Sequence, residues 1–346
     1  MKKIQQPKWK KLEYSKGQIL KAGRNIKKGC LDLESEKVLN NWRASHAFPM
    51  HVIYIHLRRF TKNKSNIIVA ERLKRKDSII NKLEREPFMS LWEMQDIGGC
   101  RMVVPPGENV YEYFEKYDKS RKRHIKIRVK DYIKNPKEDG YRSLHAVYKY
   151  HSDKREDYNR NMLIEIQFRS RLQHAWATAV ETMGTFKREA IKAGGGSRDI
   201  RRFFALVSSL FAILEGQPCV PNTPSSKEEL IKEIKELDIK NQYLEFLSGV
   251  KSATQANKDK KFDKNAAYAI LKLNYEEKKL NIILYQSSDF LEANKKYDEI
   301  EQTREKDKTD AVLVRVSSIK QLNEAYPNYY LDITGFVEIV RDQIYK

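Results

Sequence analysis

The sequence is poor in cysteine and lacks a long apolar run. Its 346 residues include three cysteines, Cys30, Cys100 and Cys219, whose wide spacing suits neither a disulfide framework nor a zinc site. The longest near-continuous apolar stretch, residues 203–214, contains two serines and is too short to span a bilayer. No apolar segment follows the basic N-terminus, so a secretory signal is not expected. These absences exclude the secreted, membrane and small metal-stabilised classes, and we expect a cytoplasmic protein.

Acidic residues are scarce in the first two thirds of the chain. Residues 1–86 hold 22 Lys and Arg against 8 Asp and Glu, and residues 87–217 hold 24 against 17. Residues 218–346 are nearly balanced, so the net charge of +20 belongs to the first two parts. Such a surface attracts a polyanion, either nucleotide phosphates with their metal or an RNA backbone. A solvated basic surface without a ligand is the alternative at this stage.

Apolar residues make up 40 % of the chain and charged residues 33 %, which is enough apolar material for real cores. The length suggests two or three folded units. Hydrophobic periodicity predicts helices near the N-terminus and a mixture of strands and helices from residue 100 onward. The predicted helices are 14–45, 51–60, 66–74, one from Asp77 or Ser78 to Arg85, 110–117, 172–191 and 200–214, and the predicted strands are 100–104, 125–129, 144–148 and 163–168.

A segment rich in proline and serine near residues 217–226 predicts a domain boundary. We therefore expect a basic helical extension (1–48), a central domain (49–217), a linker (218–226) and a smaller C-terminal α/β domain (227–346). The elements predicted for the last part are helices 227–246, 264–273 and 289–304, strands 280–285 and 311–316, and a helical tail. Its predicted role is docking on the central domain, formation of a homo-oligomer or binding of a protein partner.

Two segments carry residues suited to binding phosphates and a metal. Lys74, Ser78 and Lys82 are spaced four residues apart, so on one continuous helix they share a face, and a helix beginning at Asp77 or Ser78 would direct its N–H groups to the same region. Both arrangements suit a phosphate, and a solvated basic helix face is the alternative. Asp96 precedes two glycines and a predicted strand that carries Arg101.

Glu165 lies in the middle of an apolar strand, where a carboxylate is costly unless it is paired or bound to a metal. Alternation places Glu165 and Gln167 on one side of the strand and Ile164 and Ile166 on the other. Together with Asp96, Glu165 would provide two carboxylates for Mg²⁺, which takes its other ligands from water and substrate phosphates. An edge strand with Glu165 in solvent and an ordinary turn at Asp96 are the alternatives.

The segment 134–145 is a predicted turn leading into a strand. It places lysines, including Lys137, around Tyr141, a combination suited to stacking a base while neutralising its phosphates. His145 is the second residue of the following strand and could donate to a phosphate. A surface hairpin with incidental charges is the alternative.

Taken in order, the four segments around Arg72–Lys82, Asp96–Arg101, Lys137–His145 and Glu165–Arg169 resemble the RelA/SpoT alarmone synthetase domain. The resemblance covers roughly residues 50–215. It implies a nucleotidyltransferase-like mixed β-sheet flanked by helices, and with the other parts of the chain it gives an α/β (α+β) protein.

The resemblance implies a role for each matching residue. It implies that Asp96 binds Mg²⁺, and that Glu165 shares the metal and helps to deprotonate the acceptor hydroxyl. The implied contacts to ATP are Arg72 on the adenine, Lys74 and Lys82 on the triphosphate, and Ser78 and Arg101 beside them. The implied acceptor contacts are Tyr141 stacked on the base, with Lys137, His145 and Arg169 around it. The family usually has Asn where this chain has Asp139, which puts the acceptor contact of that position in doubt.

The implied reaction transfers the β,γ-pyrophosphate of ATP to a ribose 3′-hydroxyl and releases AMP. None of the seven histidines is followed by Asp, whereas hydrolase members of the family use a metal-binding His-Asp pair, so a synthetase without hydrolase activity is favoured. The preferred acceptor is GDP or GTP, giving (p)ppGpp. The alternative is the 3′-terminal adenosine of tRNA, as in toxin members of toxin–antitoxin pairs, and a non-catalytic regulator that binds nucleotide or RNA is the third hypothesis.

Overall fold

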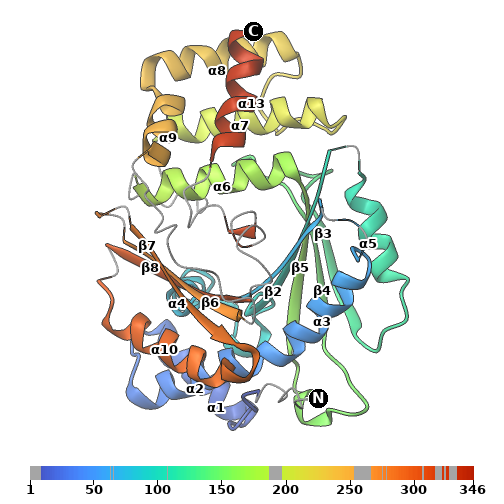
Figure 1. Cartoon of the computed structure of the whole chain (residues 1–346), viewed down its shortest axis with the longest axis vertical. Helices are drawn as coiled ribbons and strands as arrows, with labels where there is room; N and C mark the ends of the chain where they lie inside the picture. The colour runs from blue at the N-terminus through green and yellow to red at the C-terminus, as the bar shows by residue number, and fades with distance from the viewer. Residues whose placement is uncertain are drawn as a thin grey trace.

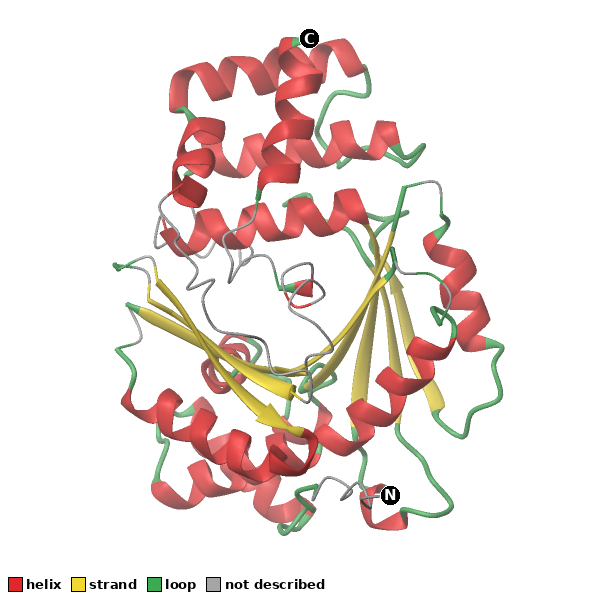
Figure 2. Ribbon diagram, in the orientation of Figure 1, coloured by secondary structure: helices red, strands yellow, loops and turns green. Residues whose placement is uncertain are grey.

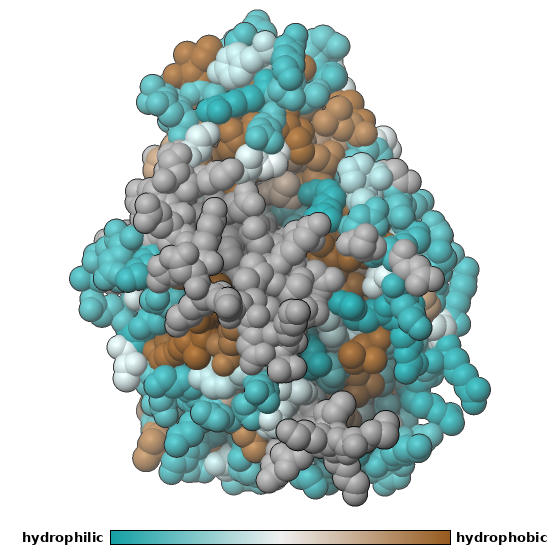
Figure 3. Space-filling model, in the orientation of Figure 1, coloured by the Kyte–Doolittle hydropathy of each residue, from teal (hydrophilic) through white to brown (hydrophobic). Residues whose placement is uncertain are grey.

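The computed structural model describes residues 9–186 except 63, 65 and 107, residues 197–252, residues 266–315 except 275, 278, 306 and 307, residues 322, 325 and 326, and residues 333–346. A curved sheet crosses the middle of the molecule, with one group of helices above it and another below it in the view of Figure 1. The strands of this sheet, yellow in Figure 2, come from both halves of the chain. Hydrophilic side chains dominate the rim of the same face, with apolar patches between them (Figure 3).

The sheet contains eight strands in the order β3-β4-β5-β2-β1-β8-β6-β7. Only β2 and β5 are parallel, and every other neighbouring pair is antiparallel. Four strands confirm the predictions made around residues 100, 125, 144 and 163. They are β2 (Gly98–Val104), β3 (Ile125–Asp131), β4 (Leu144–Lys149) and β5 (Leu163–Ser170).

The N-terminal part differs from the prediction in two ways. The single predicted helix 14–45 is two helices, α1 (Lys16–Lys27) and α2 (Leu33–Ser45), and each begins after a side-chain cap, from Ser15 and Asp32. The helix α3 (Ala47–Arg59) follows and begins four residues before the predicted helix 51–60, because Pro49 fits its first turn, where no N–H is needed.

The predicted helix 66–74 is wrong, because this segment is the strand β1 (Ile68–Leu73). Ile68 and Ala70 pack on one side of the sheet and Val69 and Leu73 on the other. A strand covered on both faces has no alternating pattern, so its sequence does not distinguish it from a helix. The helix α4 (Lys76–Arg85) then begins after Arg75 and ends before Pro87.

Helices follow the central strands largely as predicted. They are α5 (Val110–Asp118), α6 (Arg171–Phe186) and α7 (Arg198–Leu214), the last capped by Ser197. The predicted end of the first long helix at residue 191 lies outside the described residues. Trp176 is buried against α7, and its indole N–H donates to the carbonyl of Phe204.

The C-terminal part extends the same sheet. The predicted helix 227–246 is two helices, α8 (Lys227–Asn241) and α9 (Tyr243–Ser252), separated by Gln242 at φ 55°. The predicted helix 264–273 is wrong, because the described residues form β6 (Ala266–Asn274), which is apolar on both faces like β1. The remaining elements confirm the prediction: they are β7 (Lys279–Gln286), α10 (Phe290–Thr303), β8 (Thr309–Arg315) and α13 (Thr334–Tyr345).

One hydrophobic core joins the two halves of the chain. The cluster under α3 and α5 includes Met102 and Ile166 from the central strands and Tyr268 and Phe290 from the C-terminal part. On the other side of the sheet, α13 packs with α6, α7 and α8. The predicted domain boundary at residues 218–226 implies that the two parts fold independently, and this stays a prediction. None of the helices in the described segments is both long and apolar enough to cross a membrane.

Candidate active site

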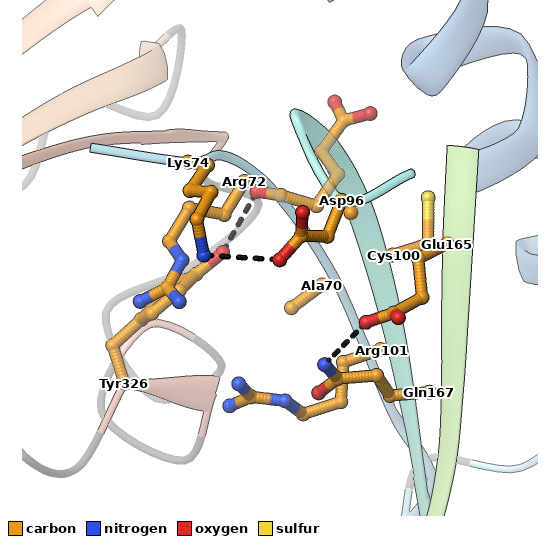
Figure 4. Close-up of a pocket in the computed structure, with 11 residues that line it drawn as sticks. Ala70, Arg72, Lys74, Asp96, Cys100, Arg101, Glu165, Gln167 and Tyr326 are labelled. Atoms are coloured by element: carbon orange, nitrogen blue, oxygen red, sulfur yellow. Dashed lines mark hydrogen bonds and ion pairs between the residues drawn. The ribbon is translucent and has the colours of Figure 1, made fainter. Parts of the chain in front are cut away.

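A cavity of about 520 Å³ opens where β1, β2 and β5 lie side by side. Figure 4 shows Arg72, Lys74, Arg101 and Glu165 converging on it together with Asp96. Register explains the convergence, because Gly99 of β2 is paired with Arg72 of β1 on one side and with Glu165 of β5 on the other. Arg72 and Glu165, which are 93 positions apart in the chain, therefore lie around one space.

Asp96 pairs with two lysines, of which Lys74 lines this cavity and Lys82 lies outside its lining. Its Oδ2 accepts a hydrogen bond from Lys74 Nζ at 3.0 Å, and its Oδ1 accepts one from Lys82 Nζ at 2.9 Å. Burial acts to raise the pKa of Asp96, but the two ammonium groups outweigh it and lower the pKa to about 2. Asp96 is thus a permanent anion at neutral pH, better suited to holding cations than to accepting a proton.

Lys74 and Lys82 both contact Asp96, but they do not share one helix face as predicted. Lys74 follows the end of β1 and Lys82 lies in the last turn of α4, so the β1–α4 connection brings them together. Burial lowers the pKa of Lys74 and Asp96 opposes this effect, which favours an additional anion near the ammonium group. Ser78 lies in α4, partly buried, and is not in the wall of the cavity.

Glu165 faces the same cavity from β5. Its Oε2 lies 3.0 Å from His145 Nδ1, and its Oε1 accepts a hydrogen bond from Gln167 Nε2 at 2.8 Å. Burial acts to raise the pKa of Glu165, whereas the imidazole of His145 lowers it more, and the net shift is downward. The predicted alternation is confirmed, since Ile164 and Ile166 lie in the core on the opposite face.

Tyr141, His145 and Arg169 form a chain of polar contacts that ends at Glu165. The Tyr141 hydroxyl lies 2.7 Å from His145 Nε2 and accepts a hydrogen bond from Arg169 Nη2 at 2.7 Å. Burial acts to raise the pKa of Tyr141, but Arg169 and His145 lower it overall. Burial likewise acts to lower the pKa of His145, and Tyr141 and Glu165 raise it overall. A protonated imidazole is therefore favoured between the phenol and the carboxylate.

A second cavity, of about 1260 Å³, lies on the other side of the two acids. Lys137, Tyr141 and His145 line it, and Lys137 Nζ is 5.5 Å from the centre of the Tyr141 ring. Asp96, Glu165 and Gln167 line both cavities. The two carboxylates therefore stand between two spaces that are both rich in Lys and Arg, of which the second is also lined by tyrosine and histidine.

Asp139 has a structural contact that accounts for its place in the turn. Its Oδ1 accepts a hydrogen bond from the backbone N–H of Tyr141 at 2.8 Å, and Gly140 between them has φ 91°. An asparagine Oδ1 could accept the same bond, so the replacement of Asn by Asp preserves the turn. The added negative charge still lies in the wall of the second cavity, beside the predicted acceptor contacts.

The surroundings of Arg101 are typical of a binding site for an anion. Its side chain is partly buried, and its Nε has no hydrogen-bond partner among the described residues. Burial lowers the pKa of Arg101, and the guanidinium groups of Arg169 and Arg72 lower it further. Several cations held near one another without enough acids are stabilised when a polyanion enters.

Three features of the site were not predicted from the sequence. They are Tyr326, the hydrogen bond from Gln167 to Glu165, and the cations Arg128 and Lys130 of the second cavity. Tyr326 comes from the C-terminal part, lines the first cavity and donates a hydrogen bond to the carbonyl of Glu71 at 2.7 Å. No local pattern marks Tyr326, because only the tertiary fold brings it to β1. Arg128 and Lys130 alternate with apolar residues in β3, and this alternation was a usable signal for a shared face.

The residues present fit a magnesium ion of the kind predicted. Within the described segments, no group of three His, Cys, Asp or Glu side chains could hold a metal alone. Two carboxylates, Asp96 and Glu165, do line one space, and Mg²⁺ commonly uses one or two carboxylates with water and phosphate oxygens. They would hold the ion only with a phosphate ligand present, because lysines and His145 now occupy their oxygens.

Comparison with known proteins agrees with the motifs. Residues 71–190 match the family described as a region found in RelA / SpoT proteins. The chain is 32% identical over 112 residues to the GTP pyrophosphokinase YjbM of Bacillus subtilis (strain 168), covering 32% of this chain and 52% of that protein. It is also 32% identical over 114 residues to YwaC of the same organism, again a GTP pyrophosphokinase, covering 31% and 52%. The chain thus spans about half the length of these curated relatives.

Two solved structures are also similar. One is a GTP pyrophosphokinase family protein from Streptococcus pneumoniae, with 27% identity and a TM-score of 0.43, covering 54% of this chain and 91% of that chain. The other is the small alarmone synthetase 1 from Bacillus subtilis, with 24% identity and a TM-score of 0.42, covering 49% and 88%. Residues 71–190, the part that matches the RelA / SpoT description, contain both acids and the residues of both cavities that were predicted from motifs.

Proposed function

We propose that the protein is an ATP-dependent pyrophosphokinase that transfers the β,γ-pyrophosphate of ATP to the ribose 3′-hydroxyl of GDP or GTP, without hydrolase activity. The observation that carries the proposal is the position of Asp96 and Glu165 in the wall shared by the two cavities. The relatives named GTP pyrophosphokinases support the same assignment.

In this proposal the first cavity binds the donor. Arg72, Lys74 and Arg101 of this cavity neutralise the triphosphate, and Lys82 joins them from the second cavity, beside Asp96. The phosphate oxygens of ATP replace Asp96 as partners of the two lysines. Mg²⁺ held by the two carboxylates would offset charge on the phosphates during transfer.

The second cavity binds the acceptor. Tyr141 stacks on the base, and Lys137, His145 and Arg169 surround it. The 3′-oxygen attacks the β-phosphorus, the bond from that phosphorus to the α-phosphate oxygen breaks, and AMP leaves. Glu165 accepts the hydroxyl proton, because it lies between the two cavities and His145 orients its carboxylate.

A second acceptor is the 3′-terminal adenosine of tRNA. The cations at the outer side of the second cavity, Arg85, Arg128 and Lys130, favour it, as does the excess of Lys and Arg in residues 1–86. The chemistry of the two acids is the same for both acceptors.

The test offers ATP, radiolabelled in its γ-phosphate, with GDP, GTP and tRNA separately. We expect label in GDP or GTP, and we expect Asp96→Asn and Glu165→Gln each to reduce kcat by at least about a hundredfold. Asp153→Asn is the matched control, because this exposed carboxylate lies outside both cavities. Label only in tRNA selects the second acceptor. Cellular effects that persist in both acid variants would show a binding regulator instead.

A further inference from the structure

The outer edge of β3 is an uncovered end of the sheet. β3 is the terminal strand, and among the described residues its only hydrogen-bonded neighbour in the sheet is β4. Residues 125–130 are all exposed to solvent. One side of this strand therefore presents backbone N–H and C=O groups to solvent, and such an edge can pair with an added strand from another chain.

Three large aliphatic side chains lie along this edge. Ile125, Ile127 and Val129 are 53%, 48% and 39% exposed. Single exposed aliphatic side chains are normal on a protein surface, and they need no explanation. Three of them within one edge strand form an aliphatic row, and a partner that covers this row removes apolar surface from water.

The side chains of β3 beyond its bulge alternate in charge as well as in direction. Arg128 and Lys130 both line the second cavity, so they point to one face of the sheet. Val129 between them is paired with Ala146 of the core, on the other face. The register with β4 shifts at Ile127, so the bulge lies before this part. The order along the regular edge is therefore cation, aliphatic, cation.

The two cations of this part have no acidic partner. No ion pair or side-chain hydrogen bond joins Arg128 or Lys130 to another described residue. Lys126 of the same strand, in contrast, pairs with Asp118 at 2.6 Å. Opposite charges directly across a ladder are stabilising. The edge therefore favours a strand with the order acid, aliphatic, acid.

A second copy of β3 does not fit this edge. An antiparallel pair centred on Val129 would put Arg128 of each copy directly across from Lys130 of the other. A pair centred on Arg128 would put this residue across from itself and Lys126 across from Lys130. Like charges directly across a ladder are destabilising. The occupant that matches the edge is therefore an acidic segment of another protein.

We propose that an acidic, extended segment of a partner protein adds to β3 as a further strand of the sheet, with carboxylates across from Arg128 and Lys130 and an aliphatic side chain across from Val129. A polynucleotide would satisfy the two cations but would leave the aliphatic row and the free backbone groups unused. Because both cations also line the second cavity, the bound segment would neutralise them there and weaken binding of the acceptor. This effect on the acceptor rests on the proposed function, whereas binding of the segment does not.

The test measures binding of a fluorescently labelled peptide of about eight residues, in which glutamate and valine alternate, to the full chain by anisotropy. We expect Arg128→Ala/Lys130→Ala to weaken binding about fivefold, because two cross-strand charge pairs are lost. Lys37→Ala/Lys232→Ala is the matched control. It removes the same charge from exposed lysines of α2 and α8, outside the second cavity, and should bind the peptide as the parent does.

Three further measurements separate strand pairing from attraction by charge. Val129→Glu keeps both cations but puts a carboxylate in the aliphatic row, outside the lining of the second cavity, and we expect about tenfold weaker peptide binding with an unchanged KM for GDP. Of two peptides N-methylated on either the glutamates or the valines, one cannot complete the ladder, and we expect it to bind at least about tenfold more weakly than the other. The unmodified peptide should raise the KM for GDP and leave the KM for ATP unchanged.

Any of four results would overturn the inference: an equal loss of binding in the two double variants, equal binding of the two N-methylated peptides, equally tight binding of a glutamate peptide without valine, or binding of a single-stranded RNA through Arg128 and Lys130 with no binding of the peptide. Absence of transfer to any acceptor would overturn the proposed function alone, because peptide binding is measured without substrates.

Discussion

Asp96 contributes to the stability of the fold as well as to the proposed site. Its carboxylate is mostly buried, with 20% of the side chain exposed, and two lysines from different elements neutralise it. The pKa of Asp96 is about 2 in the folded state and about 3.8 in the unfolded state. The ionised carboxylate therefore contributes its full stabilisation at pH values above 3.8, and this contribution is lost as the pH falls through 2.

We therefore expect Asp96→Asn to reduce the free energy of unfolding by about 2 kcal/mol at neutral pH and by much less near pH 2. The reason is that the parent protonates Asp96 in the acid range and the variant has nothing there to protonate. Urea unfolding followed by circular dichroism between pH 7 and 2 checks it. Asp153→Asn, with an exposed carboxylate, is the control. A difference between parent and variant that stays constant with pH would contradict the linkage.

The residues of the site could be predicted better than their geometry. The order of the motifs predicted the two acids, the cations of the first cavity and the Tyr141 and His145 pair, and the structure places them around two adjoining cavities. The route by which Lys74 and Lys82 meet was not predicted, because it depends on where β1 ends. Ser78 remains a prediction, since it lies outside both linings.

At the scale of elements, strands with one polar face were recognised and strands buried on both faces were not. β5 alternates between the core and the site, so its period was visible in the sequence. β1 and β6 are apolar on both faces, because helices or other segments cover each side. Whether such a segment is a strand or a helix depends on neighbours that are remote in sequence, and the periodicity of the segment itself does not show them.

The turn before β4 shows how packing positions the acceptor residues. Gly140 has φ 91°, and a Cβ at this position would lie 2.9 Å from Trp176 Cζ2 and 3.2 Å from Ala205 Cα. The Ser208 hydroxyl donates to the Gly140 carbonyl at 2.6 Å and accepts from Arg142 Nε at 3.0 Å. Helices α6 and α7 thus hold the segment that carries Tyr141.

We expect Gly140→Ala to destabilise the protein by about 3 kcal/mol, because left-handed strain and overpacking add. Gly216→Ala is the matched control: Gly216 also has positive φ, 64°, but nothing lies within 4 Å of its added Cβ, so we expect only about 1 kcal/mol. Chemical denaturation of both variants gives the comparison. Equal losses in the two would show that contact with α6 and α7 does not restrict the turn.

At the scale of the whole molecule, the C-terminal strands are joined to the central sheet through β1 and β8. The backbone register between them includes a single pair, Arg72 with Val314. Side chains strengthen the junction: Arg304 contacts Asp77 at 2.5 Å, and Arg75 pairs with Asp310. The shared core described above lies directly under this junction. These contacts favour one cooperative unit over two independently stable domains.

The cooperative unit can be tested from its far edge, because all four tryptophans lie before residue 218. Leu280 is buried in β7, and β8 and β6 separate β7 from β1. Leu280→Ala should cost about 3 kcal/mol, and in a cooperative molecule the tryptophan-fluorescence midpoint in urea should fall as far as the circular-dichroism midpoint. The exposed neighbour gives the control, Lys279→Ala, which should move neither midpoint. If the circular-dichroism midpoint fell further than the fluorescence midpoint, residues 227–346 would be unfolding on their own, as the predicted linker implies.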